Sequence, residues 1–146
     1  MENGIPLITS KNLKNGQIDF TTAKTISFED HYIISQRSKV ERDDILFAMI
    51  GSIGNPVLYT GNNEFSIKNM ALFKKVSSEA NMSYILLYLE IAQENMRKES
   101  SGGVQSFVSL KYLRNYLIPL PPLTEQQRIV DKLEQLNVFI DQLTKS

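Results

Sequence analysis

Three prolines within four residues are followed at once by a helical pattern, and this junction constrains the chain more than any other feature. The prolines lie in the sequence PLPP of residues 119–122. Proline disfavours the helical conformation in the residue before it, so Leu120 and Pro121 are expected to be extended. Thr124 can then cap a helix, and Gln127, three residues on, completes the T-x-x-Q pattern of a capping box. The junction predicts a rigid turn that directs a C-terminal helix away from the body.

The predicted C-terminal helix carries its large apolar residues on one narrow line. Their spacing of 4, 3, 4 and 3 is the a and d pattern of a coiled-coil seam, with Gln126 at the preceding a position. If residues 125–146 are all helical, the helix is about 33 Å long at 1.5 Å per residue. The seam can pair with a helix of a second copy or of a partner subunit, or it can pack on its own domain. The residues predicted to pair are Ile129, Leu133, Leu136, Ile140 and Leu143.

Upstream of the junction, strand and helix patterns alternate, which predicts a mixed α/β (α+β) body. A capping-box-like Ser27 begins a short helix with the apolar stripe Phe28, Tyr32 and Ile33. The best helical spacing is that of residues 81–98, with Asn81 as N-cap, and Ser109 is expected to cap one more short helix. Extended segments are expected at residues 6–9 and 17–20, which flank a turn at 12–16, and at 45–50, 56–60, 66–76 and 117–120.

The sequence offers little to catalysis or metal binding. It has no cysteine and one histidine, His31, so it can form neither a disulfide scaffold nor a His-based metal cluster. No Walker loop, G-x-G-x-x-G, N-P-P-Y or acidic-x-Lys motif is present. Gly51 and Gly54 are better explained by a strand turn than by a phosphate cradle, and Asp43–Asp44 by a solvated strand entry than by an acid/base pair. We therefore predict no catalytic residues, no metal and no cofactor.

Polar turns rich in Lys, Arg, Asn and Gln are the remaining candidates for function, because these side chains contact DNA phosphates and base edges. Formal net charge is zero, with 13 Lys and Arg against 12 Asp and Glu in residues 1–122. DNA binding therefore requires the basic residues to gather on one face, whereas scattering among acids would favour a protein-interaction module. The predicted DNA-binding residues are Lys11, Asn12, Lys14, Asn15, Gln36, Arg37, Lys39, Lys68, Asn69, Gln105 and Lys111.

Several segments, in order along the chain, resemble the specificity (S) subunits of type I restriction–modification systems. The most specific is PLPPLTEQQRIV at the junction, which is similar to the start of a conserved helical region of that family. Upstream, IPLITSKNLKNGQI, DDILFAMIGSIG, IKNMALF and GGVQSFVSLKYLRNYLIPLPPL resemble, in the family's order, segments of a target-recognition domain. The likeness extends from about Ile5 to Leu143.

The resemblance implies a non-catalytic, sequence-specific DNA-binding module. It implies twisted, mostly antiparallel strands in a target-recognition domain, residues 1–122, shortened at its N-terminus, followed by a conserved-region helix, residues 123–146. Such a domain would read one half of a split target in double-stranded DNA and dock the methyltransferase (M) subunit and, through it, the restriction (R) subunit. A homodimer through the helix is a further option.

The expected compartment is the cytoplasm, with no membrane association, since no secretion signal and no apolar run of spanning length is present. The alternative function is a protein-interaction module that dimerises through its C-terminal helix and never binds DNA.

Overall fold

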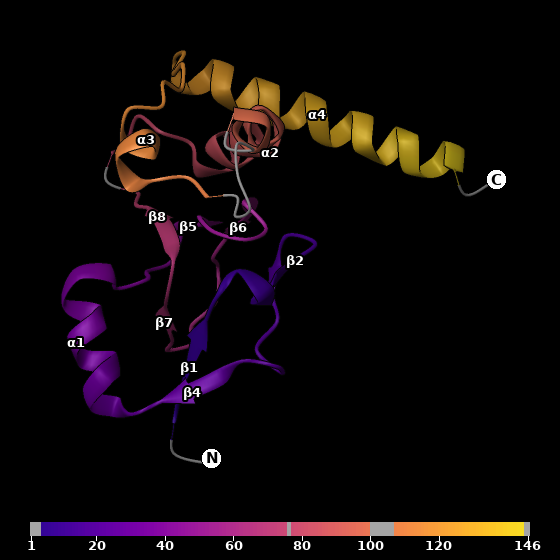
Figure 1. The fold of residues 1–146 in the computed structure, drawn as a ribbon. Helices are drawn as coiled ribbons and strands as arrows, with labels where there is room; N and C mark the ends of the chain where they lie inside the picture. Colours follow the sequence, from indigo (N-terminus) through magenta and orange to yellow (C-terminus); the bar gives the residue numbers. More distant parts are fainter. Residues whose placement is uncertain (1–3, 76, 100–106, 145–146) are drawn as a thin grey trace.

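The computed structural model describes residues 4–75, 77–99 and 107–144, which form a mixed α/β body and one long terminal helix. Figure 1 shows the first helix and part of the strands at the end that holds the N-terminus, the other labelled strands towards the middle, the other helices at the opposite end, and the last helix running past the body. The strands are β1 Ile5–Ile8, β2 Leu13–Lys14, β3 Gln17–Ile18, β4 Lys24–Ile26, β5 Ile45–Ala48, β6 Gly54–Leu58, β7 Ser66–Ile67 and β8 Met70–Phe73. The helices are a 3-10 turn at Ser10–Asn12, α1 Phe28–Ser38, α2 Met82–Glu99, α3 Leu110–Arg114 and α4 Leu123–Thr144.

Strand β5 separates two hydrophobic cores. It lies between β6 and β8 and pairs antiparallel with both. Because successive side chains of a strand point to opposite faces, Ile45 and Phe47 pack in the core beneath α2 and α3, whereas Leu46 and Ala48 pack in the second core, towards β1 and β7. All four residues are fully buried. The mostly antiparallel α/β fold predicted from the sequence is confirmed.

A second three-stranded sheet has the order β4-β1-β7 and includes the one parallel pair among the described strands, β1 with β7. The expected strand 66–76 is wrong as a single element: Asn69, with a φ of 55°, divides it into β7 and β8, which belong to different sheets. Segments 6–9 and 17–20, expected as extended on either side of a turn at 12–16, do not pair with each other in the described structure. Strand β3 pairs with β2 across Asn15–Gly16, whose φ values of 53° and 75° fit the two-residue turn that closes tight hairpins.

The caps of the three upstream helices are as predicted. The hydroxyl of Ser27 accepts a hydrogen bond from the Asp30 amide, Asn81 caps α2, and Ser109 caps α3. The apolar stripe of α1, however, faces solvent: Phe28, Tyr32 and Ile33 are all more than half exposed. The positive φ values of Gly51 and Gly54, 75° and 98°, confirm the turn interpretation of these glycines.

The beginning of α4 differs from the expected capping box. The helix starts at Leu123, and the Pro122 carbonyl accepts hydrogen bonds from the Glu125 and Gln126 amides. Thr124 is therefore inside the first turn and is not its cap. The expected solvated strand entry at Asp43–Asp44 is also wrong for Asp44, which is 2% exposed.

Asp44 joins the entry of β5 to the end of β8. Its carboxylate accepts hydrogen bonds from the Glu41 and Lys75 amides and from the Lys74 ammonium, the last at 2.6 Å. Burial of Lys74 opposes its charge, but the hydrogen bonds to Asp44 and Glu41 outweigh this effect and raise the pKa of Lys74 above the ordinary lysine value. The acidic pair is thus a structural anchor, because one of its carboxylates is paired and buried.

Candidate nucleic-acid interface

The parallel strands β1 and β7 bring two distant turns together. Carboxyl ends of parallel neighbours meet at the same edge of a sheet, so the turn after Ile8 and the turn after Ile67 lie side by side. The Lys68 amide donates a hydrogen bond of 3.1 Å to the Ile8 carbonyl, which fixes this arrangement. Lys11 and Lys68 therefore face the same hollow, although 57 positions separate them in the sequence.

Strand β4 adds a third lysine to this hollow. It pairs antiparallel with β1 and places Lys24 opposite Leu7. No Asp or Glu is among the residues that line the hollow, and within the described part of the chain none of its three lysines forms an ion pair. Three exposed, uncompensated ammonium groups around a polar hollow can bind a phosphate backbone. We name it the lysine hollow, of about 370 Å³, lined by Leu7, Thr9, Ser10, Lys11, Asn12, Thr22, Lys24, Lys68 and Asn69.

Asn12 belongs to the wall of the lysine hollow but is 5% exposed. Its side-chain oxygen accepts a hydrogen bond from the Thr9 amide, and its Nδ2 donates to the Asp19 carbonyl and to the Thr22 hydroxyl. These bonds tie the turn that bears Lys11 to the turn before β4. We therefore assign Asn12 to loop architecture, in place of the DNA contact predicted from the sequence.

Asn12→Ala is expected to lower the free energy of unfolding by about 1–3 kcal/mol, because it leaves buried backbone groups without hydrogen-bond partners. Urea unfolding followed by circular dichroism measures this loss. The matched control is Asn15→Gly, an exposed turn position with positive φ, which should change stability by less than about 0.5 kcal/mol. Equal effects of the two substitutions would contradict the role given to Asn12.

Of the other predicted DNA-binding residues that the structure describes, only Asn69 joins the lysine hollow. Lys14 pairs with Asp19 at 3.4 Å, and Asn15 forms the neighbouring turn. Gln36 and Lys39 line a second hollow beside α1, together with His31 and Glu64. Arg37 is exposed in the last turn of α1, and Lys111 is exposed on α3. Gln105 lies outside the described residues. Lys24 was missed from the sequence because only the pairing of β4 with β1 brings it to the site.

His31 links α1 to β7. Its Nδ1 lies 2.7 Å from the Ser66 hydroxyl and its Nε2 lies 3.3 Å from the Glu64 carboxylate. This order resembles that of a nucleophile, base and acid, but Ser66 is 1% exposed, so its hydroxyl cannot meet a substrate. Among the described residues, no group of three or more His, Cys, Asp or Glu is placed to hold a metal ion.

Gln126 fixes the beginning of α4 to the body. It is fully buried, its Nε2 donates to the carbonyls of Glu79 and Pro121 at 2.9 and 2.8 Å, and its Oε1 accepts from the Asn81 amide at 2.8 Å. The next residue, Gln127, accepts a further hydrogen bond from the Asn81 side chain. A residue that the sequence placed on the helix seam is therefore a polar clamp between α4 and the beginning of α2.

Beyond this clamp the seam leaves the body. Val130 is buried and Ile129 packs against the same core, next to α2. Farther along, Leu136, Ile140 and Leu143 are 48%, 51% and 61% exposed. Packing on its own domain, one of the arrangements left open by the sequence, holds for the first turns of α4. The distal half projects from the body (Figure 1), and its pairing with a partner stays a prediction. No described helix combines the length and apolar character needed to cross a bilayer.

The same fold, a mixed α/β body followed by one long helix, occurs among solved structures. A solved structure, the HsdS subunit from Thermoanaerobacter tengcongensis, matches 98% of this chain with a TM-score of 0.69 and 24% identity, over 32% of its own chain. That likeness shows the fold.

Sequence comparison establishes the family. All of residues 1–146 match the family described as the type I restriction modification DNA specificity domain, and the protein belongs to this family. It is 27% identical over 150 aligned residues to the type I restriction enzyme EcoBI specificity subunit of Escherichia coli, covering 99% of this chain and 31% of the relative. It is 42% identical to the E. coli EcoEI specificity subunit over 76 residues, 48% of this chain and 12% of that relative. The chain thus spans less than a third of the length of either subunit.

Proposed function

We propose that this domain reads one half of a split target in double-stranded DNA, without catalysing a reaction itself. The observation that carries the proposal is the lysine hollow, where Lys11, Lys24 and Lys68 meet and no Asp or Glu is among the described residues that line it. Ammonium groups position a DNA backbone but carry no sequence information, so base contacts must come from polar side chains beside them. Asn69 in the hollow wall is the nearest such candidate, and Lys14, Asn15, Gln36, Arg37, Lys39, Gln105 and Lys111 stay as predicted contacts.

The zero net charge of this chain favours an interface in which another subunit also contacts the DNA. A protein that binds DNA alone usually carries a broad basic surface. Here the positive charge is local, so we propose that the methyltransferase subunit supplies further backbone contacts and also carries the chemistry, with the restriction subunit joining through it. The complex would act on DNA in the cytoplasm. A module that avoids DNA is not favoured, because it gives no reason for three lysines to gather in one hollow without an ion pair to any described residue.

We also propose a division of labour at the proline junction. Residues 1–122 form the target-recognition domain and residues 123–146 the conserved-region helix, which docks the partner subunit or a second copy. Support comes from the contrast along α4, where Gln126 and Val130 are buried and Leu136 and Ile140 are about half exposed.

Selection from a random duplex library tests the reading of a half-target. With the chain bound to the methyltransferase subunit of its own locus, the enriched DNA should share one short motif, because each wrong base pair costs about 1–3 kcal/mol. A matched selection with the methyltransferase subunit alone should enrich no motif. Enrichment that is the same with and without this chain would refute the proposed function.

A further inference from the structure

The face of the β4-β1-β7 sheet that carries the lysine hollow also carries α1. Residues paired across a sheet point to the same face, and Lys24 of β4 and Ser66 of β7 are both paired with Leu7 of β1. Leu7 and Lys24 line the hollow. The two chain neighbours of Ser66 point the other way, into the second core. Since the Ser66 hydroxyl lies 2.7 Å from Nδ1 of His31, α1 packs on the same face as the lysine hollow.

Three exposed residues form the outward surface of α1. Successive helical residues are about 100° apart around the axis. Ile33, Gln36 and Arg37 follow His31 by two, five and six positions, which places all three on the side opposite His31. Ile33 is 60% exposed, and Gln36 and Arg37 are also exposed. Because His31 faces the sheet, these three side chains point away from it, and we name them the α1 strip.

The C-terminal half of α1 lies beside the lysine hollow. His31 contacts Ser66, and farther along α1 the Lys39 carbonyl accepts a hydrogen bond of 3.0 Å from the Lys74 ammonium. Lys68, which lines the hollow, comes between Ser66 and Lys74 in the chain. The part of α1 between these two contacts therefore runs alongside the end of β7, where Lys68 lies.

The charges of α1 agree with this placement. Its acidic residues, Glu29 and Asp30, lie in the first turn, whereas Arg37 lies in the last. A phosphate backbone repels carboxylates and attracts a guanidinium. DNA held by the lysine hollow would therefore meet the C-terminal half of α1 and not its acidic beginning.

The chemistry of the α1 strip matches base edges in the major groove. There a guanidinium pairs with guanine, an amide pairs with adenine, and an apolar side chain contacts the thymine methyl group. Within the described residues Arg37 forms no ion pair, and the Gln36 side chain bonds only to the Tyr32 carbonyl, at 3.4 Å.

The size of a helix also selects the groove. The major groove is about 12 Å wide and admits an α-helix, whereas the minor groove, about 6 Å wide, does not. No residue of α1 is buried, so its outward side is open to an approaching duplex.

We propose that the C-terminal half of α1 enters the major groove of the half-target, while the lysine hollow holds the adjacent phosphates. Arg37 and Gln36 each read a purine through its N7 edge, and Ile33 reads a thymine through its methyl group. This inference rests on the proposed half-target reading and names the element that does it. Ile33, an apolar side chain that the fold leaves in solvent, thereby becomes a specificity determinant.

Base analogues test this assignment. The ligand is the duplex that the random-library selection enriches, bound by the chain together with its methyltransferase subunit. Each purine of the half-target is replaced in turn by its 7-deaza analogue, and each thymine by deoxyuridine. These changes remove one major-groove contact and leave base pairing intact. We expect the affinity to fall about tenfold at two purines and by a smaller factor at one thymine.

The α1 variants should remove these penalties one by one. Arg37→Ala and Gln36→Ala should each abolish the 7-deaza penalty at a different purine, and Ile33→Ala should abolish the deoxyuridine penalty at the thymine. The salt slope should change by about one at most, because base contacts release few counterions.

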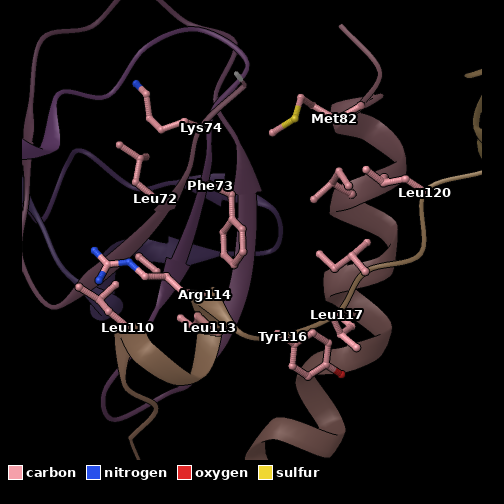
Figure 2. A pocket seen from close by; sticks show the side chains of 14 residues that line it. Leu72, Phe73, Lys74, Met82, Leu110, Leu113, Arg114, Tyr116, Leu117 and Leu120 are labelled. Atoms are coloured by element: carbon pink, nitrogen blue, oxygen red, sulfur yellow. The ribbon is translucent and has the colours of Figure 1, made fainter. Parts of the chain in front are cut away.

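The matched control is Leu117→Ala, which shortens an exposed apolar side chain elsewhere. Leu117 is 87% exposed and lines the apolar groove of Figure 2, whose walls include Phe73 of β8 and Met82 of α2. These two residues pack in the core beneath α2 and α3, away from the sheet that carries the lysine hollow. The control should keep every analogue penalty of the wild type.

Three results would overturn the proposal. The first is a selected duplex that tolerates every 7-deaza purine but loses affinity when hypoxanthine, which lacks the minor-groove amino group, replaces guanine. The second is a set of penalties that the three α1 variants leave unchanged. In both cases half-target reading stands, because a motif was enriched. The third is loss of the methyltransferase subunit from folded α1 variants, which would make the α1 strip a protein contact. A half-target without thymine would contradict the role of Ile33 alone.

Discussion

Gln126→Met should lower the free energy of unfolding by about 3 kcal/mol, a large fraction of the stability of a domain this size. The substitution keeps the length of the side chain but removes three hydrogen bonds, to the Asn81 amide and to the carbonyls of Glu79 and Pro121. Each buried group left without a partner costs about 1–3 kcal/mol, so three such groups account for a loss of about 3 kcal/mol or more. Thermal and urea unfolding measure the change.

The control is Gln127→Met, the same substitution one position on. The Gln127 side chain is exposed, so its hydrogen bonds to Asn81 and Asp131 exchange with water at little cost. We expect a change of less than about 1 kcal/mol. Hydrogen exchange should also show the first turns of α4 losing protection only in Gln126→Met. If the two variants behave alike, the clamp does not fix the helix.

Leu133→Asp combined with Leu136→Asp should abolish pairing of α4, whether the partner is a second copy or the methyltransferase subunit. A large aliphatic side chain contributes about 1.5–3 kcal/mol when it becomes buried, so the affinity should fall at least a hundredfold. The domain itself should stay folded, because the core takes Val130 and Ile129 from α4 and the projecting half lies beyond it. Sedimentation and co-purification report the pairing, and circular dichroism reports the fold.

Gln135→Asp with Gln142→Asp is the matched control for the seam. It adds the same two negative charges to α4 but away from the a and d line. It should leave pairing almost unchanged. If the seam variant unfolds while the control does not, the distal half of α4 belongs to the domain core and the pairing role is wrong.

Local features of the sequence predicted the helices well. Ser27, Asn81 and Ser109 cap the helices expected of them, because a cap depends only on residues two or three positions away. The start of α4 was predicted two residues too late. Thr124 was expected to cap the helix, but the helix begins at Leu123 and the Pro122 carbonyl accepts its first hydrogen bonds.

Features that depend on distant pairing could not be predicted. Lys24 reaches the lysine hollow only through the pairing of β4 with β1, and Lys68 only through the parallel pairing of β7. Asp44 was expected at a solvated strand entry and Gln126 on the helix seam, yet both are buried against partners about 30 and 45 residues away in the sequence. Periodicity describes the face of an element but not the partner on that face, so it does not reveal that a polar residue is buried against a distant segment.

The salt dependence of DNA binding tests the central claim, that the lysine hollow faces the DNA backbone. The variant removes all three lysines by Lys11→Ala, Lys24→Ala and Lys68→Ala, and the control removes three other positive charges by Arg42→Ala, Lys75→Ala and Lys132→Ala. Each lost phosphate contact reduces the slope of log K against log salt by about 0.9. In anisotropy titrations of duplex DNA with the chain bound to its methyltransferase subunit, we expect the slope to fall by about 2 to 3 for the hollow variant and to stay near the wild-type value for the control. Equal slopes for the two variants would contradict the account.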